Sequence, residues 1–176
     1  SINIVDTQLL TEKYHAPHLA IHRADLHQIL LSKVLGDVVR TGKRAVSAQQ
    51  NTDGVEVTFH DGSTHQARAL IVADGIHSPI RKQTVPGSEP RYAGYTCWRA
   101  VINYPGDLSG AATETWGPKG RFGIVPLPNH QVYWFACINA PANDSRCKNF
   151  TVDDLFVQFR DYHEPVSDIL KHTRNE

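Results

Sequence analysis

Arg68-Ala69-Leu70-Ile71-Val72-Ala73-Asp74-Gly75-Ile76-His77-Ser78-Pro79-Ile80-Arg81 is the segment around which this 176-residue sequence is expected to be organised. Its apolar run from Ala69 to Ala73 does not alternate, which is typical of a strand buried on both faces of a parallel sheet. Gly75 allows the chain to turn directly after the strand. Open α/β sheets bind ligands at the carboxyl ends of their strands, so Asp74 is a candidate binding residue. Ser78, Pro79 and Arg81 are expected on the exit loop.

Composition and charge narrow the class of protein. The sequence is 40% hydrophobic and 20% charged, as in an ordinary globular protein, and its 18 basic residues balance 18 acidic ones. That balance predicts no nucleic-acid partner. No apolar stretch reaches the length of a membrane span. Cys97, Cys137 and Cys147 are odd in number and have no C-x-x-C spacing, which argues against a disulfide framework or a zinc site and fits a reducing cytoplasm.

The beginning of the sequence predicts an excised internal piece. There is no Met, and Ser1 already stands inside an apolar alternating run. We therefore expect the remainder of a parent chain to be missing. Ile2 to Val5 indicates a short strand, and Leu9 to Pro17 a polar connection.

The next segment, Ile21 to Gly36, predicts a helix of about three turns. Leu26, Ile29, Leu30 and Val34 fall at helical spacing. Asp25 suits the positive first turn and Gly36 a helix end. Arg23 stands at the start of this helix, where a cation is unfavourable unless an anion lies beside it.

An antiparallel meander is expected upstream of the Leu70 strand. Its strands are placed at 38–49, 55–60 and 64–68, joined by turns at Asn51–Gly54 and Asp61-Gly62. Val55, Val57 and Phe59 alternate with polar residues, which indicates one buried face.

Beyond Arg81 the composition changes. The loop Pro86-Gly87-Ser88-Glu89-Pro90 is a predicted domain crossing. Aromatic-rich strands are expected at 92–103, 112–116, 121–126 and 131–139. An acid-capped helix is expected at 151–162, and a second helix from Glu164-Pro165. The predicted fold class is α+β, with an antiparallel sheet and packed helices joined to part of an α/β domain.

The Ala-Asp-Gly-x-x-Ser-x-x-Arg pattern at residues 73–81 resembles the Asp-Gly motif of the FAD-dependent aromatic hydroxylases, the single-component flavoprotein monooxygenases. His22-Arg23-x-x-Leu26-x-x-x-Leu30 is similar to another pattern of that family. The segments Gly94–Arg99, Gly117–Pro126 and Val132–Phe135 are similar to parts of its substrate domain. By eye the sequence is nearest to the urate-hydroxylase-like and zeaxanthin-epoxidase-like members.

The resemblance implies an enzyme in which NADH or NADPH reduces FAD and dioxygen then supplies an oxygen atom to a small aromatic or unsaturated substrate. It implies that Arg23 reaches the FAD and that Asp74 and Gly75 lie near the pyrophosphate, with Arg81 at a dinucleotide. Residues 1–85 would be part of the FAD-binding domain, with the first strand there or in the substrate sheet, and residues 86–176 the substrate-binding domain. The family's Gly-rich fingerprint and its later Gly-Asp motif are not in this sequence, so the chain alone is expected to be inactive and to bind FAD weakly or not at all.

Arg121 and Tyr133 are the candidate substrate residues. Arg121 follows a Gly-containing turn and begins a strand, and Tyr133 is expected on the next strand. The two could approach on one face only if the register permits. A guanidinium and a phenol would suit an anionic or carbonyl-bearing aromatic ring.

The flavin would carry the chemistry, so we expect no catalytic side chain. No Ser-His-Asp or paired-carboxylate arrangement has persuasive spacing. Two alternatives stay open: a flavin-dependent reductase or halogenase on the same scaffold, and a non-enzymatic ligand-binding domain.

Overall fold

The computed structural model describes residues 7–17, 19–34, 36–108 and 110–173. Packing divides the chain into two compact units. The first unit comprises Ser1–Leu30 and Gly94–Glu176, and the second comprises Leu31–Ala93. The short strand expected at residues 2–5 lies outside the described residues.

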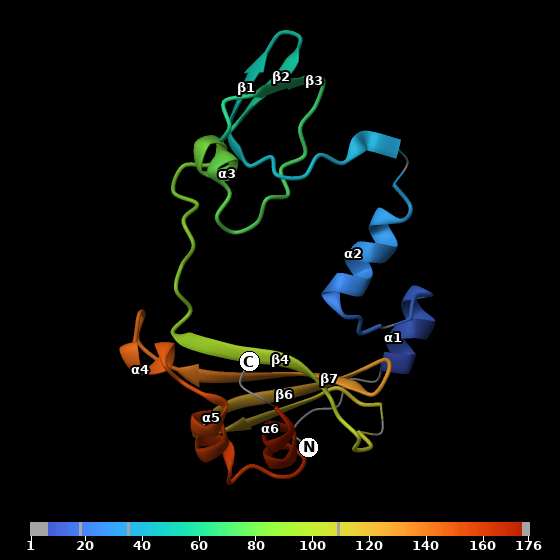
Figure 1. The fold of residues 1–176 in the computed structure, drawn as a ribbon, viewed down its shortest axis with the longest axis vertical. Helices are drawn as coiled ribbons and strands as arrows, with labels where there is room; N and C mark the ends of the chain where they lie inside the picture. Colours follow the sequence, from blue (N-terminus) through green and yellow to red (C-terminus); the bar gives the residue numbers. More distant parts are fainter. Residues whose placement is uncertain (1–6, 18, 35, 109, 174–176) are drawn as a thin grey trace. The chain divides into compact units, whose positions relative to one another are not determined.

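The first unit is built on a four-stranded antiparallel sheet. The four aromatic-rich strands predicted from the sequence are confirmed, and their order across the sheet is β4-β7-β6-β5 (Figure 1). Their bounds are β4 Tyr95–Asn103, β5 Thr113–Gly117, β6 Gly120–Leu127 and β7 Gln131–Asn139.

One face of this sheet packs against two helices, α5 (Val152–Phe159) and α6 (Val166–His172) (Figure 1). Alternate residues of the strands point into this layer, because successive side chains of a strand face opposite sides. The core joins aromatic and aliphatic side chains of strands and helices: Phe122, Ile124, Val132, Trp134, Leu155, Phe159, Val166, Ile169 and Leu170. This layer covers one face of the sheet and leaves the other face for other contacts.

The predicted acid-capped helix is α5. Thr151 accepts a hydrogen bond from the backbone N–H of Asp154, and the Asp154 carboxylate accepts one from the backbone of Thr151. The reciprocal pair is a capping box that satisfies two otherwise unpaired donors. A short helix, α4 (Ser145–Lys148), precedes it and is capped by Asp144.

Two further helices belong largely to the first unit. α1 (Thr7–Tyr14) overlaps the segment Leu9 to Pro17, which the sequence predicted only as a polar connection of uncertain form, and ends before Pro17, which could not continue a helix. α2 (Arg23–Leu31) is shorter than the helix predicted to reach Gly36. Its apolar residues Leu26, Ile29 and Leu30 are exposed in the described structure.

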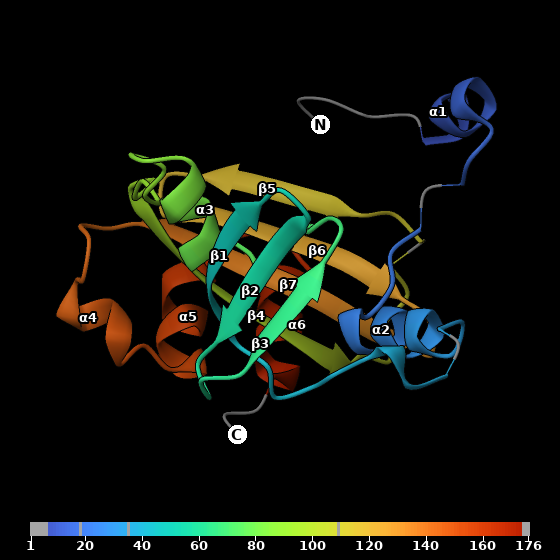
Figure 2. The ribbon, with the colours of Figure 1, turned by 90° about the horizontal axis from the view of Figure 1, so that it is seen from above.

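The second unit contains the predicted meander. β1 (Ala45–Asn51), β2 (Gly54–Phe59) and β3 (Thr64–Ala67) form an antiparallel sheet in that order (Figure 2). The first strand begins at Ala45 rather than at Val38, which instead ends a 3₁₀ turn at Gly36–Val38. Val57 is buried, as its alternation predicted.

The buried strand expected at Ala69 to Ala73 is not formed. Ile71 is 91% exposed, and Leu70 and Val72 are also exposed. A strand needs neighbours to take its backbone hydrogen bonds, and a segment destined for a parallel sheet also needs covering layers. The described residues supply neither at this position, so this prediction is wrong for the chain as it stands.

The exit loop is also corrected. Pro79–Thr84 form helix α3, with buried Ser78 as its N-cap and Pro79 in the first turn. Pro suits that position because it has no N–H to leave unpaired. Arg81 is therefore held on a helix rather than on a loop.

Throughout the described ranges, every helix is too short or too polar to cross a lipid bilayer.

Candidate functional site

The sheet of the first unit has a second face, opposite to α5 and α6, which we call the Arg121 face. In the β6–β7 ladder Arg121 is opposite Cys137, and Val125 is opposite Tyr133. Directly opposed residues share a face, and so do residues two apart along a strand. The same rule assigns to this face Tyr95, Cys97, Arg99, Val101, Asn103, Glu114, Trp116, Arg121, Gly123, Val125, Leu127, Gln131, Tyr133, Phe135, Cys137 and Asn139.

Arg121 and Tyr133 therefore lie on one face, as the substrate hypothesis requires. They are four positions apart along the ladder, which corresponds to about 13 Å. The guanidinium is thus not beside the phenol. The two side chains instead bracket the row that contains Gly123 and Phe135.

Phe135 fills the space above Gly123. A Cβ at Gly123 would come within 2.0 Å of the Phe135 ring, so the ring lies directly over the glycine. The Phe135 ring also packs against Tyr133, with centroids 6.1 Å apart. The result is an aromatic floor between Arg121 and Tyr133.

Arg121 is fixed by its neighbours on the same face. Its guanidinium lies 5.0 Å from the ring centroid of Tyr95 and 6.0 Å from that of Trp116. Its Nη1 is 3.5 Å from the Glu114 carboxylate. The side chain is about one-third exposed, so it retains donors for a ligand while the aromatic rings restrict its position.

In the second unit, Arg81 shapes the Asp-Gly loop. It donates hydrogen bonds to the carbonyl of Ile76 (2.6 Å), the carbonyl of Gly75 (3.4 Å) and the Ser88 hydroxyl (3.2 Å). Gly75 has a φ of +87°, a conformation that favours glycine, and no atom lies within 4 Å of where its Cβ would be. The Asp74 side chain is exposed. Arg81 thus holds the loop while the backbone at Gly75 stays accessible.

Arg23 is the first residue of α2 and is exposed. Its Nε is 3.5 Å from His27 Nε2, one turn along the helix. The His22 ring accepts a hydrogen bond from the backbone N–H of Ala24 and thereby satisfies one donor of the first turn. Arg23 belongs to the first unit and Asp74 to the second.

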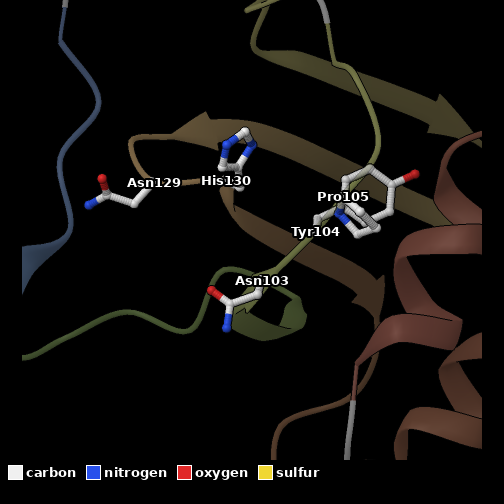
Figure 3. Close-up of a pocket in the computed structure, with 5 residues that line it drawn as sticks. All are labelled: Asn103, Tyr104, Pro105, Asn129 and His130. Carbon is white, nitrogen blue, oxygen red and sulfur yellow. The ribbon is translucent and has the colours of Figure 1, made fainter.

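A shallow hollow of about 430 Å³ lies at the end of β4, beside the β6–β7 turn (Figure 3). Asn103, Tyr104, Pro105, Asn129 and His130 line it, and none of them was a predicted site residue. The Tyr104 hydroxyl points away from the hollow and donates to the Asp168 carboxylate at 2.7 Å. Burial, followed by that carboxylate, raises the pKa of Tyr104 to about 12. These contacts give Tyr104 a structural role.

Sequence reasoning missed several residues of the Arg121 face, namely Tyr95, Glu114, Trp116, Gly123 and Phe135. Alternation along each strand identifies them only when the strand register is known.

No group of three or more potential metal ligands occurs among the residues that the structure describes.

Comparison with known proteins relates this arrangement to a class of flavoenzymes. The chain is 34% identical over 164 residues to aurachin C monooxygenase/isomerase of Stigmatella aurantiaca, covering 90% of this chain and 41% of that protein. It is 30% identical over 167 residues to the FAD-dependent urate hydroxylase of Klebsiella pneumoniae, covering 92% and 43%. The solved structure of Klebsiella pneumoniae HpxO complexed with FAD and uric acid matches with a TM-score of 0.77 at 29% identity, over 95% of this chain and 44% of that one.

The homologues of this chain are FAD-dependent monooxygenases. The resemblance seen in the sequence is therefore confirmed, as is the α+β class with an antiparallel substrate-domain sheet. The chain spans less than half of the length of the relatives described above. No protein-family model matches it.

Proposed function

We propose that this chain is part of an FAD-dependent monooxygenase that uses NADH or NADPH and dioxygen to hydroxylate or epoxidise a small aromatic or unsaturated substrate. The main support is the match of 95% of the chain to a protein whose structure contains FAD and uric acid. The Arg121 face is chemically suited to such a substrate.

A flat ring fits the aromatic floor. Phe135 offers a ring for stacking, and the bare backbone of Gly123 beneath it lets that ring lie flat. Arg121 supplies a planar fork of donors for an anionic or carbonyl oxygen at one end. Tyr133 supplies a hydroxyl at the other end, so the two residues would set the substrate's orientation.

The residues of the Asp-Gly loop fit a dinucleotide. Gly75 leaves its backbone open to close approach, and Asp74 can accept hydrogen bonds from hydroxyl groups or water. Arg81 holds the loop that carries Asp74 and Gly75, because it donates hydrogen bonds to the carbonyls of Gly75 and Ile76. Arg23 offers a cation for a phosphate. FAD, when bound, supplies the electron transfer and oxygen activation, and the protein orients the substrate and excludes water.

Two assignments remain predictions. We place the boundary between the flavin and substrate parts near residue 85, where the loop at 86–90 begins. We also place the enzyme in the cytoplasm, in keeping with three free cysteines.

The intact protein should consume oxygen in a reaction that depends on NADH or NADPH and is accelerated by substrate. An oxygen electrode with aromatic carboxylates and hydroxylated heterocycles as candidate substrates measures this. Purified protein that binds FAD yet shows no reduced-nicotinamide oxidation with either cofactor would contradict the proposal.

Arg121→Ala in the intact enzyme should lower kcat/KM by about 30-fold, which corresponds to about 2 kcal/mol for a lost charge-assisted hydrogen bond. Its FAD content should not change, because Arg121 is assigned to the substrate. The matched control is Arg146→Ala, since Arg146 is a largely exposed arginine on α4 of the same unit that pairs with Asp144. Equal kinetics for both variants would remove Arg121 from the substrate site.

A further inference from the structure

Two cysteines of the Arg121 face are direct cross-strand neighbours. Cys97 of β4 is opposite Cys137 of β7 in a ladder without register shifts. Both belong to the face that carries Arg121, and Arg121 is in turn opposite Cys137. The third cysteine, Cys147, lies apart on α4.

The hydrogen bonds at the two ends of the β4–β7 ladder show whether Cys97 and Cys137 form a hydrogen-bonded or a non-hydrogen-bonded pair. The Tyr104 N–H donates to the His130 carbonyl at 2.8 Å, and the Ala140 N–H donates to the Gly94 carbonyl at 3.1 Å. Both continue the β4–β7 register, so both are hydrogen-bonded pairs. Such pairs alternate with non-hydrogen-bonded pairs along an antiparallel ladder.

Cys97 lies an odd number of positions from both Gly94 and Tyr104, so Cys97 and Cys137 form a non-hydrogen-bonded pair. In such pairs the Cα atoms are about 4.5 Å apart and the side chains are closest. A disulfide needs Cα atoms about 4.4 to 6.8 Å apart. The register therefore places the two backbones at this separation, and the Cys97 thiol donates to the carbonyl of Trp98 at 3.5 Å.

The two thiols differ in access. Cys97 is exposed, whereas Cys137 is 7% exposed. A small oxidant in solution therefore meets Cys97 first, and the buried partner is placed to attack the oxidised sulfur. An accessible thiol beside a resolving thiol is one feature of cysteine pairs that close on oxidation, whereas the raised pKa of Cys97 makes this pair slower to react than the low-pKa thiols of redox sensors.

We propose that Cys97 and Cys137 form an oxidative modification site, at which hydrogen peroxide converts the dithiol to a cross-strand disulfide beside Arg121. The Cys97 thiolate attacks one peroxide oxygen, so that an S–O bond forms, the O–O bond breaks, and hydroxide leaves to become water. The Cys137 sulfur then attacks the Cys97 sulfur. An S–S bond forms, the S–O bond breaks, and the released hydroxide takes the Cys137 proton to give a second water.

The pH dependence of this reaction follows from its surroundings. Although Cys97 is an exposed residue, partial burial of its sulfur, and then the neighbouring Cys137 thiol, raise the pKa of Cys97 to about 11, while the cations Arg99 and Arg121 act in the opposite direction. The thiolate is the reactive form, so the oxidation is slow at neutral pH. Its rate should rise roughly tenfold per pH unit below that pKa.

Peptide mapping of the full chain tests the site directly. Trypsin separates the three cysteines into the peptides Tyr92–Arg99, Phe122–Arg146 and Cys147–Lys148. After exposure to hydrogen peroxide and digestion without reductant, we expect the first two to be joined, with a loss of two hydrogen atoms. Free thiols should fall from three to one, and that one should be Cys147.

Cys147→Ser is the matched control and should keep the cross-link, whereas Cys97→Ser and Cys137→Ser should each abolish it. A trivalent arsenical, phenylarsine oxide, tests the reduced pair independently of oxidation. It should bind wild type tightly with release of one water, and should bind either single-serine variant of the pair at least about tenfold more weakly. Three persisting thiols, a sulfinic acid at Cys97 without the link, or a link to Cys147 would overturn the proposal.

Discussion

At the scale of single residues, Gly123 and Phe135 form the tightest contact of the Arg121 face. Gly123→Ala should destabilise the protein by about 1–3 kcal/mol, because the new methyl group overlaps the Phe135 ring and forces it to move. In a Phe135→Ala background the same change should be neutral or stabilising by about 0.5–1 kcal/mol, since alanine costs less backbone entropy than glycine. Urea denaturation of the four proteins measures this, and equal effects in both backgrounds would refute the contact.

The residues of this face also show where sequence reasoning ends. Arg121 and Tyr133 could be selected by their turn and by resemblance, but Glu114 and Trp116 could not. Their importance depends on β5 pairing with β6 so that Trp116 is opposite Arg121, a fact about register. A slip of one residue would move the entire set to the helix-covered face.

At the scale of elements, the capping box of α5 should carry measurable stability. Thr151→Ala should cost about 1 kcal/mol, because it removes the side-chain acceptor for the Asp154 N–H. Asp154→Ala should also destabilise, whereas Asp153→Ala is the matched control, since Asp153 lies in the same first turn outside the box.

The effect of Asp154 should depend on pH. Hydrogen bonds from the backbone and side chain of Thr151 lower its pKa from 3.8, so the folded state favours the charged carboxylate. This contribution is present above pH 3.8 and is lost as pH falls below it. Thermal melts at pH 7 and at pH 3 should therefore show the gap between wild type and Asp154→Ala closing at the lower pH. A gap that stays constant would argue against the box.

Elements differed in how well the sequence predicted them. β4 to β7 and α5 have local patterns that agree with their packing, so prediction and structure coincide closely. The Ala69 to Ala73 segment has an equally clear pattern but no partner strands among the described residues. Its hydrophobic run suits a buried environment, and without that environment the segment has no regular secondary structure and is exposed.

At the scale of the whole molecule, the two units differ in core size. Eleven buried residues form the core of the sheet in the first unit. In the second, Val57 and Ile80 are the buried hydrophobic residues within the part that the structure describes. A unit of the second one's size buries only about 60% of the surface that its unfolded chain exposes, a smaller share than in larger domains, and is marginal in stability. We therefore expect it to unfold first.

Two spectroscopic probes separate the units, because Trp98, Trp116 and Trp134 all belong to the first. In a urea titration, far-UV circular dichroism should show an early transition that tryptophan fluorescence does not report. Ile80→Ala should move only the early transition, and Leu155→Ala should move the fluorescence transition, each by about 2–4 kcal/mol for a deleted core side chain. Coincident transitions in wild type and in both variants would instead indicate a single cooperative unit, since agreement between probes is the test of two-state unfolding.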